Sequence, residues 1–243
     1  YGITENGIKF IQREIGLPKF AYVYNDFAYS HKPVPVMITD LIPESDLIEL
    51  LKNSKKKNSS KEKEKTALLS DNSTQFLTKA IRGYGIKKTL NISVWEAPID
   101  QVEIQIMNSL SEFHKKSFDT TIIFESSHSL LKQYNSTSSK EEFSDTQFER
   151  TKNLIDKLLE STQSKIILFN YYEINDQIFG NNSSKKKTSF IYHLRRLNFL
   201  ISESTSRTNR ISMLDISTIQ NKIGSKNMFD SSLYVNYGMV LSL

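Results

Sequence analysis

Cysteine is absent from this chain of 243 residues, and it contains only eight glycines, five prolines and one tryptophan. Without cysteine the chain can form neither disulfide bonds nor thiolate metal sites, a composition typical of reducing compartments. We therefore expect a cytoplasmic protein. The few glycines form no P-loop and no GxGxxG motif. This argues against a nucleotide cradle, and we expect no cofactor in this chain.

Long apolar runs are also missing, since no stretch approaches the roughly 18 consecutive apolar residues that a membrane span requires. No secretory signal is visible at the first residue, Tyr1, which is not a methionine. We expect no membrane partner. A hydrophobic fraction of 38% with 14 Phe and 11 Tyr is too apolar for a disordered chain.

The net charge of +5 comes largely from lysines in two polar tracts. One spans residues 52–65 and the other residues 185–187, and both are surrounded by Asn and Ser. Neither tract contains the arginine clusters or interleaved aromatic residues that favour base stacking and readout. We therefore interpret them as solvated loops and expect no nucleic-acid partner.

The sequence divides into a small α+β leader, a linker and an α/β domain. The leader covers residues 1–53, with a helical pattern at residues 8–15 and a helix opened by Pro43, and residues 54–65 form a Lys-rich linker. From residue 66 to 243, strand and helix patterns alternate, which predicts a parallel sheet covered by helices on both faces. The expected strands are 66–69, 90–95, 120–124, 165–170 and 211–215, and the expected helices are 75–83, 101–110, 145–160 and 189–204.

Polar residues follow several of these strands, at the edge of a parallel sheet where ligands collect. The candidate ligand-binding residues are Asp71, Asn72, Glu96, Glu125, Ser126, Ser127 and Asn170. Acidic residues after a strand more commonly cap the next helix, and a metal needs at least three converging ligands. We expect no metal site.

The first strand exit, TALLSDNSTQFL, is the most informative segment. A polar turn there runs directly into a helix, an arrangement in which backbone N–H groups and a hydroxyl can point to one spot. Ser73 is a candidate nucleophile with His128 as its base, because such a pair needs only to meet in space. The alternative is that Ser73 or Thr74 simply caps the following helix.

Taken in order, the stretches LLSDNSTQFL, SVWEAPIDQVEIQIMN, FDTTIIFESSHSLLKQY and KIILFNYYEINDQIFGN resemble the SGNH hydrolase fold, a three-layer α/β/α domain. More closely, residues 66–243 resemble the amino-terminal region of FkbH-like proteins. In that family, an SGNH-like domain precedes a haloacid-dehalogenase-like domain that is implicated in loading a glyceryl-type unit onto an acyl carrier protein. The resemblance implies that this catalytic domain would follow the present chain.

The resemblance also implies SGNH roles that this sequence leaves largely unfilled. The nucleophile position falls on Asn72, with Ser73 one place late, and Pro98, near the position of the oxyanion glycine, has no N–H to donate. The asparagine of the SGNH pattern would lie near Ser126 or Ser127, where this sequence has no asparagine. The histidine of the pattern should lie near the carboxyl end, yet no histidine follows His193. The haloacid-dehalogenase nucleophile motif needs a second aspartate two residues after the first. That motif is absent as well, because Ser73 stands two residues after Asp71.

We therefore interpret the chain as a fragment with a weakly active or non-catalytic domain that binds substrate or acyl carrier protein. The positive net charge would favour an acidic carrier. A second hypothesis is an SGNH-type esterase or acyltransferase with a rearranged Ser73–His128 pair. A third is a purely structural domain. The apolar closing segment MFDSSLYVNYGMVLSL indicates a join to a following domain.

Overall fold

The computed structural model describes residues 44–55, 63–174, 178–206 and 208–242 of the chain, with only the backbone at residues 44–47. The helical pattern at residues 8–15 and most of the expected leader and linker lie outside these ranges. The chain divides into two units between Ile42 and Pro43. The second unit, beginning at Pro43, contains all of the described residues.

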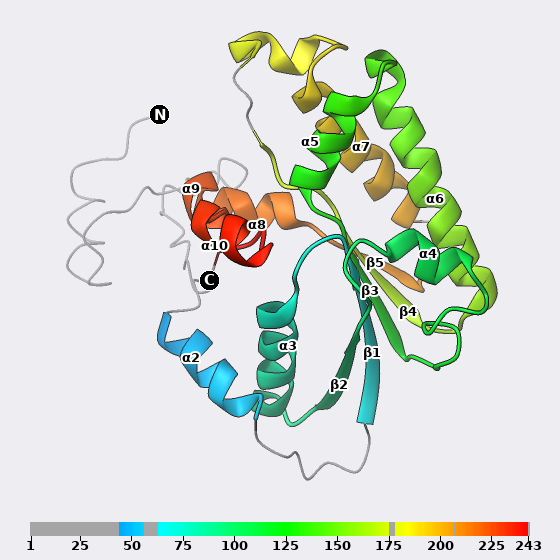
Figure 1. Ribbon diagram of the computed structural model, residues 1–243, viewed down its shortest axis with the longest axis vertical. Coiled ribbons are helices and arrows are strands. Elements are labelled where there is room, and N and C mark those ends of the chain that lie inside the picture. Colours follow the sequence, from blue (N-terminus) through cyan, green and yellow to red (C-terminus); the bar gives the residue numbers. More distant parts are fainter. Residues whose placement is uncertain (1–43, 56–62, 175–177, 207, 243) are drawn as a thin grey trace, which may run out of the picture. The chain divides into compact units, whose positions relative to one another are not determined.

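A five-stranded parallel sheet forms the centre of this unit (Figure 1). The strands lie in the order β2-β1-β3-β4-β5, so the order of winding reverses between β1 and β3. In register, Leu69 of β1 lies beside Ile123 of β3, and Ile123 lies beside Leu168 of β4. The strands are β1 (Lys63–Ser70), β2 (Asn91–Glu96), β3 (Thr120–Phe124), β4 (Lys165–Phe169) and β5 (Ile211–Leu214). This confirms the predicted α/β fold class.

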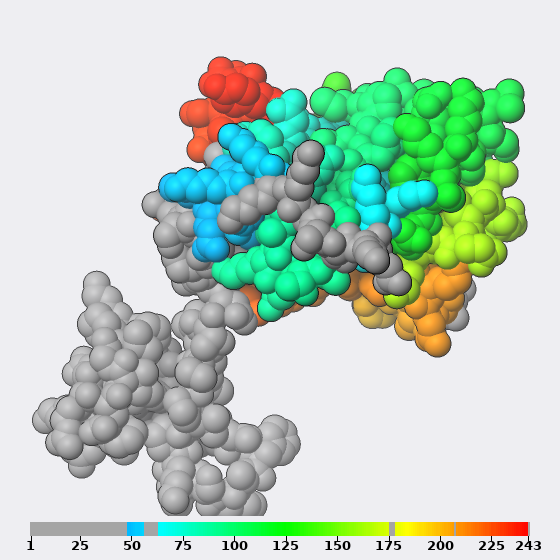
Figure 2. All heavy atoms as spheres, turned by 90° about the horizontal axis from the view of Figure 1, so that it is seen from below, coloured from blue at the N-terminus to red at the C-terminus, as the bar shows by residue number. Residues whose placement is uncertain are grey.

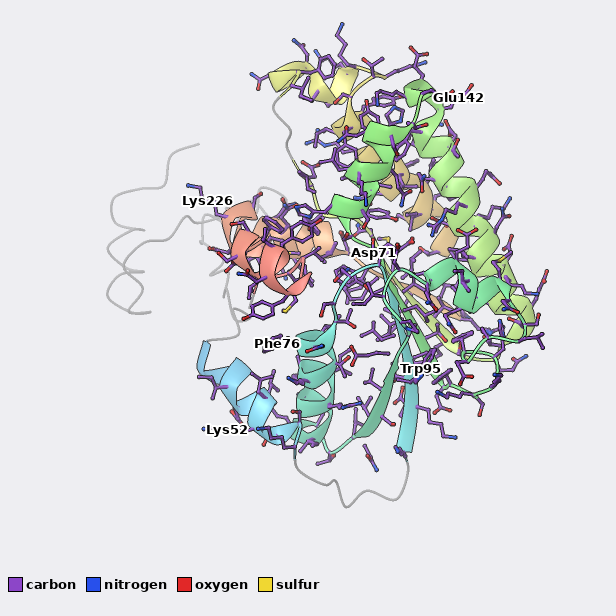
Figure 3. The ribbon with its side chains drawn as sticks, in the orientation of Figure 1. Lys52, Asp71, Phe76, Trp95, Glu142 and Lys226 are labelled. Atoms are coloured by element: carbon purple, nitrogen blue, oxygen red, sulfur yellow. The ribbon has the colours of Figure 1, made fainter. Side chains whose placement is uncertain are left out.

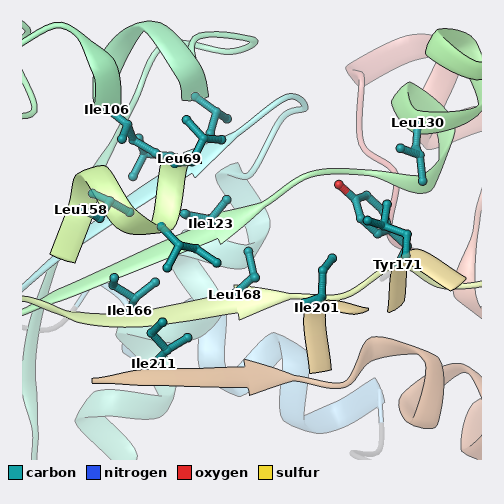
Figure 4. Close-up of a cluster of buried hydrophobic side chains, with 14 of the residues drawn as sticks. Leu69, Ile106, Ile123, Leu130, Leu158, Ile166, Leu168, Tyr171, Ile201 and Ile211 are labelled. Atoms are coloured by element: carbon teal, nitrogen blue, oxygen red, sulfur yellow. The ribbon is translucent and has the colours of Figure 1, made fainter. Parts of the chain in front are cut away.

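One face of the sheet is covered by the helices α4 (Val102–Met107), α5 (Ser127–Ser136), α6 (Phe143–Ser161) and α7 (Phe190–Thr205). Alternate strand residues point to this face because successive side chains of a strand lie on opposite sides. Leu69, Ile123 and Leu168 meet Leu158 of α6 and Ile201 of α7 in the larger buried cluster (Figure 4). These side chains are at most 4% exposed, so this core fixes the helices that surround the carboxyl edge.

The opposite face is covered by α3 (Gln75–Lys87), by the helices α8 (Ile216–Ile223) and α9 (Ser225–Met228), and by the last residues of the chain. Leu68 and Phe124 from the strands pack with Ile216 and with Met228 and Val240. The result is a three-layer α/β/α arrangement. Between α9 and Val240 lies the short helix α10 (Ser231–Tyr237), which ends at Gly238 with a left-handed φ of 64°.

A helix that the sequence assigned to the leader, α2 (Glu44–Asn53), packs against α3. Figure 2 shows α2 in blue beside the teal spheres of α3. Contact is close because Gly83 has no side chain, so the backbone of Leu50 can approach it. The α/β unit therefore includes α2, whereas the sequence placed the boundary at residue 53. In addition, β1 begins at Lys63, within the predicted linker.

Predicted and observed helices agree best where the apolar pattern is long, as in α6 and α7. The sequence missed α5, α8, α9 and α10, together with the short 3₁₀ segments η2 (Lys140–Glu142) and η3 (Gly180–Lys185). Within the described ranges, no helix is long and apolar enough to cross a membrane.

Candidate functional site

The carboxyl edge of the sheet is where β1 and β3 end side by side and their chains leave in opposite directions. The helix after β1, α3, covers one face, and the helices after β3, α5 and α6, cover the other. A crevice opens at such a reversal in doubly wound sheets, and ligands bind there. Figure 3 marks Asp71 at this edge, with Phe76 at the start of α3 and Trp95 within β2. Asp71 therefore lies at the position that the topology favours for a ligand.

Asp71 joins the ends of β1 and β3. Its carboxylate accepts hydrogen bonds from the backbone N–H of Ser126 at 3.0 and 2.9 Å and from the Ser126 hydroxyl at 3.3 Å. The Asn72 side-chain amide donates to it at 2.8 Å. The Ser126 hydroxyl in turn caps α5 by accepting from the N–H of Ser129 at 3.1 Å. These bonds fix the geometry of both strand exits.

Glu125 and Arg150 form a bidentate ion pair beside Asp71. The Arg150 guanidinium donates to Glu125 at 2.8 and 3.0 Å and to Glu103 of α4 at 3.2 Å. Burial alone would lower the pKa of Arg150, but the hydrogen bonds and charge of Glu125 raise it, so the guanidinium stays charged. Burial, with the negative charge of Glu125, raises the pKa of the neighbouring Tyr171 hydroxyl well above its ordinary value. Arg150 thus connects α6 to the end of β3 and to α4.

A pocket of about 650 Å³ opens over these groups. Its floor and walls come from the β1 and β3 ends, from the loop before α4, from α4 itself and from α5 and α6. The lining residues are Asp71, Asp100, Val102, Glu103, Ile104, Met107, Asn108, Glu125, Gln133 and Arg150. Its size lies in the ordinary range for small-molecule sites. Among the described residues, no group of three His, Cys, Asp or Glu side chains could hold a metal ion.

Residues 65–243 match the model of the FkbH N-terminal domain. The chain belongs to this family. It is also similar to a crystal structure of the N-terminal part of the protein BF1531 from Bacteroides fragilis, which contains a phosphatase domain and was complexed with Mg. Sequence identity is 36% and the TM-score is 0.75 over 81% of this chain, which spans about half (52%) of the solved chain. Among curated proteins, none matches this chain.

In this FkbH N-terminal domain, the two proposed catalytic side chains have separate surroundings. The Ser73 hydroxyl makes no hydrogen bond to His128 in the described part of the chain, and the Ser73 N–H donates to the Gly238 carbonyl at 3.0 Å. His128 Nδ1 is 2.7 Å from the Tyr172 hydroxyl, and its ring stacks on Phe229 at 4.3 Å. Burial lowers the pKa of His128, although the charge of Asp71 opposes that shift.

The remaining candidate ligands make internal contacts. Asn72 donates to the Ser70 hydroxyl at 2.9 Å, and Ser127 donates to the Tyr172 carbonyl at 2.7 Å. Glu96 accepts from the Thr74 hydroxyl at 2.8 Å, across the exits of β2 and β1. Of the predicted set, only Asp71 and Glu125 line the pocket.

Asn170 connects the ends of β4 and β5. Its amide donates to the Asp215 carboxylate at 2.8 Å and accepts from the N–H of Ile216 at 2.7 Å. Burial would raise the pKa of Asp215, but hydrogen bonds from Ser217, Thr218 and Asn170 lower it. Asp215 therefore remains ionised and caps α8.

Among the pocket residues that the sequence reasoning missed, the one that pairs with a predicted residue is Arg150. It lies within α6, four and eight residues before the buried Leu154 and Leu158, and so belongs to the same face of the helix. An arginine in line with an apolar stripe is the signal that could have identified it, because such a charge needs a partner near the sheet.

Proposed function

We propose that this domain binds, without cleaving it, a substrate of a longer FkbH-like biosynthetic protein. The observation that carries the proposal is the pocket at the reversal between β1 and β3, lined by Asp71 and Glu125. Both carboxylates have fixed partners, so the pocket walls are organised before a ligand arrives. Preorganised polar groups with an apolar border are typical of ligand sites.

The internal contacts of the SGNH-type positions argue against ester cleavage. A serine nucleophile needs a base within about 3 Å, and the site loses its efficiency when one member of the triad is removed. The SGNH resemblance assigns the nucleophile position to Asn72, and the His128 ring is engaged by Tyr172 and Phe229. The alternative proposal remains an esterase or acyltransferase in which Ser73 and His128 move together.

One assay separates these two proposals. Hydrolysis of a short-chain p-nitrophenyl ester is measured with the wild-type chain and with Ser73→Ala, and Ser189→Ala serves as a control for loss of a serine elsewhere. Equal background rates in all three proteins are expected for a binding domain. Turnover that disappears only in Ser73→Ala would reject the binding proposal and support the esterase.

The partner of the domain is the second part of the proposal. The solved relative contains a phosphatase domain, and we propose that the longer protein has one as well. The family resemblance implies that this haloacid-dehalogenase-like domain transfers a glyceryl-type unit to an acyl carrier protein in the cytoplasm. The net charge of +5 favours encounter with an acidic carrier. Titration with such a carrier should show binding that weakens as salt is raised, and salt-independent binding or none would contradict carrier docking.

A further inference from the structure

The charges that line the pocket are unequal. Four carboxylates, of Asp71, Asp100, Glu103 and Glu125, face a single cation, Arg150. Glu125 is 13% exposed and Arg150 26%, so their mutual pairing is shielded from solvent, while Asp100 and Glu103 lie at the exposed rim. A negatively charged ligand entering here would meet like charges in a partly desolvated space, where repulsion is stronger than in water.

Arg150 does not provide a free anion site. Its Nε donates to Glu103, and its two terminal nitrogens donate to Glu125. These bonds use three of the five N–H donors, and the carboxylates of Glu125 and Glu103 already balance the single positive charge, so a ligand carboxylate or phosphate would meet a net negative charge. The lining groups that remain available are mainly acceptors, and they favour a ligand that donates hydrogen bonds.

One wall of the pocket is apolar and exposed. Ile104 and Met107 of α4 line the pocket, yet they are 58% and 47% exposed. The same helix buries Val102 and Ile106 in the larger core, which fixes the helix in place. An apolar surface that continues from a rigid helix into a pocket is suited to an aliphatic chain.

We infer that the pocket takes a ligand with an uncharged or positively charged head that donates hydrogen bonds, and with an aliphatic chain that lies along Ile104 and Met107. This inference rests on the proposed function, because it specifies the ligand class of the same pocket. It also fixes the chemical form of an acyl substrate. Such a substrate would enter as an ester, thioester or amide rather than as a free acid or phosphate.

Binding of three six-carbon probes tests the ligand class. Hexylammonium, hexanamide and hexanoate are titrated into the whole chain, and the backbone amide shifts of Val102, Glu103 and Asn108 are followed by NMR. We expect hexylammonium and hexanamide to bind at least about tenfold more tightly than hexanoate. Methylammonium should bind at least about tenfold more weakly than hexylammonium, because it lacks the chain that contacts α4.

Single substitutions test the two walls separately. Met107→Ala should weaken hexylammonium binding severalfold, and Asp100→Asn should reduce the preference for hexylammonium over hexanoate. Phe199→Ala, on the exposed side of α7, and Asp156→Asn, on α6, are the matched controls and should change neither quantity.

Each contrary result has a distinct meaning. Hexanoate binding as tightly as hexylammonium would overturn the ligand class while leaving the proposed binding function intact. Equal affinity for methylammonium and hexylammonium, or wild-type affinity in Met107→Ala, would overturn the role of α4. No pocket shifts with any probe would overturn the whole inference, and the ester assay and carrier titration would still decide the proposed function.

Discussion

Both carboxylate oxygens of Asp71 accept the backbone N–H of Ser126, at 3.0 and 2.9 Å, so the end of β1 is tied directly to the end of β3. The two residues are 55 positions apart in the sequence. Because the winding of the sheet reverses between these strands, the contact stabilises the edge at which the pocket opens.

Asp71→Ala should lower the free energy of unfolding by about 1–3 kcal/mol, because the N–H and hydroxyl of Ser126 lose their acceptor. Asp71→Asn should cost less, since one acceptor oxygen remains. Urea denaturation measures both changes. The control Asp156→Ala removes an exposed carboxylate from α6 and should stay within about 0.5 kcal/mol of wild type. A wild-type stability for Asp71→Ala would contradict the structural role of this contact.

Arg150→Met should lower the free energy of unfolding by about 3–5 kcal/mol, because it leaves the shielded carboxylate of Glu125 without a cation. The double variant Arg150→Met/Glu125→Gln should recover part of that loss, which a double-mutant cycle in urea measures. Arg196→Met breaks an exposed pair with Asp145 and should cost at most about 1 kcal/mol. Equal losses for the two arginines would contradict a special role for the shielded pair.

Gly83→Ala should destabilise the unit although alanine is the better helix former. A Cβ at this position would lie 2.0 Å from the Leu50 carbonyl oxygen, so α2 and α3 would have to separate. We expect a net loss of about 1–3 kcal/mol in thermal or urea unfolding, typical of overpacking. Gly85→Ala is the comparison, because its nearest neighbour is the end of the Ile92 side chain at 3.0 Å. Greater loss in Gly85→Ala would contradict this account of the helix contact.

Stability should fall as the pH decreases from about 7 to 5, partly because of His193. Its Nδ1 accepts from the N–H of Ser144 at 3.3 Å, so Nε2 carries the proton and donates to the Lys187 carbonyl at 2.6 Å. Burial lowers the pKa of this histidine below its ordinary value. The unfolded chain therefore takes up a proton near pH 6.5 that the folded chain resists, and unfolding becomes more favourable.

His193→Gln should reduce this pH dependence, since glutamine offers a donor and an acceptor without titrating. Urea unfolding at pH 7 and pH 5 measures the difference. His128→Gln should reduce the remaining slope, because burial also lowers the pKa of His128. An unchanged slope in the double variant would show that other groups control the acid response.

The strands and the principal helices could be predicted from the sequence because their apolar residues recur with a clear period. Asp71 and Glu125 could be identified because each follows a predicted strand, and parallel strands bring their carboxyl ends to one edge of the sheet. Arg150 was missed because its partners lie 25 and 47 positions away and no local pattern reveals them. The same limit applies to Ser73, whose N–H bonds to the distant Gly238 carbonyl.

The closing segment shows a different limit. Its apolar residues led to the expectation of a join to a following domain, which stays a prediction. Met228 and Val240 pack in the cluster on the second face of the sheet, and Met239 is also buried. The sequence could not separate these residues from Val235 and Tyr237, which remain exposed on α10, because the helix is only two turns long and has no clear apolar period.

The burial of Met239 and Val240 also determines when the domain can finish folding during synthesis. The first four strands can pair as they leave the ribosome, but the part of the second face that Ile216, Met228 and Val240 cover stays open until these late residues have emerged. At ordinary translation rates this interval lasts on the order of seconds. During that time Leu68 and Phe124 remain accessible to chaperones, and the turn at Ser73 lacks its acceptor from Gly238.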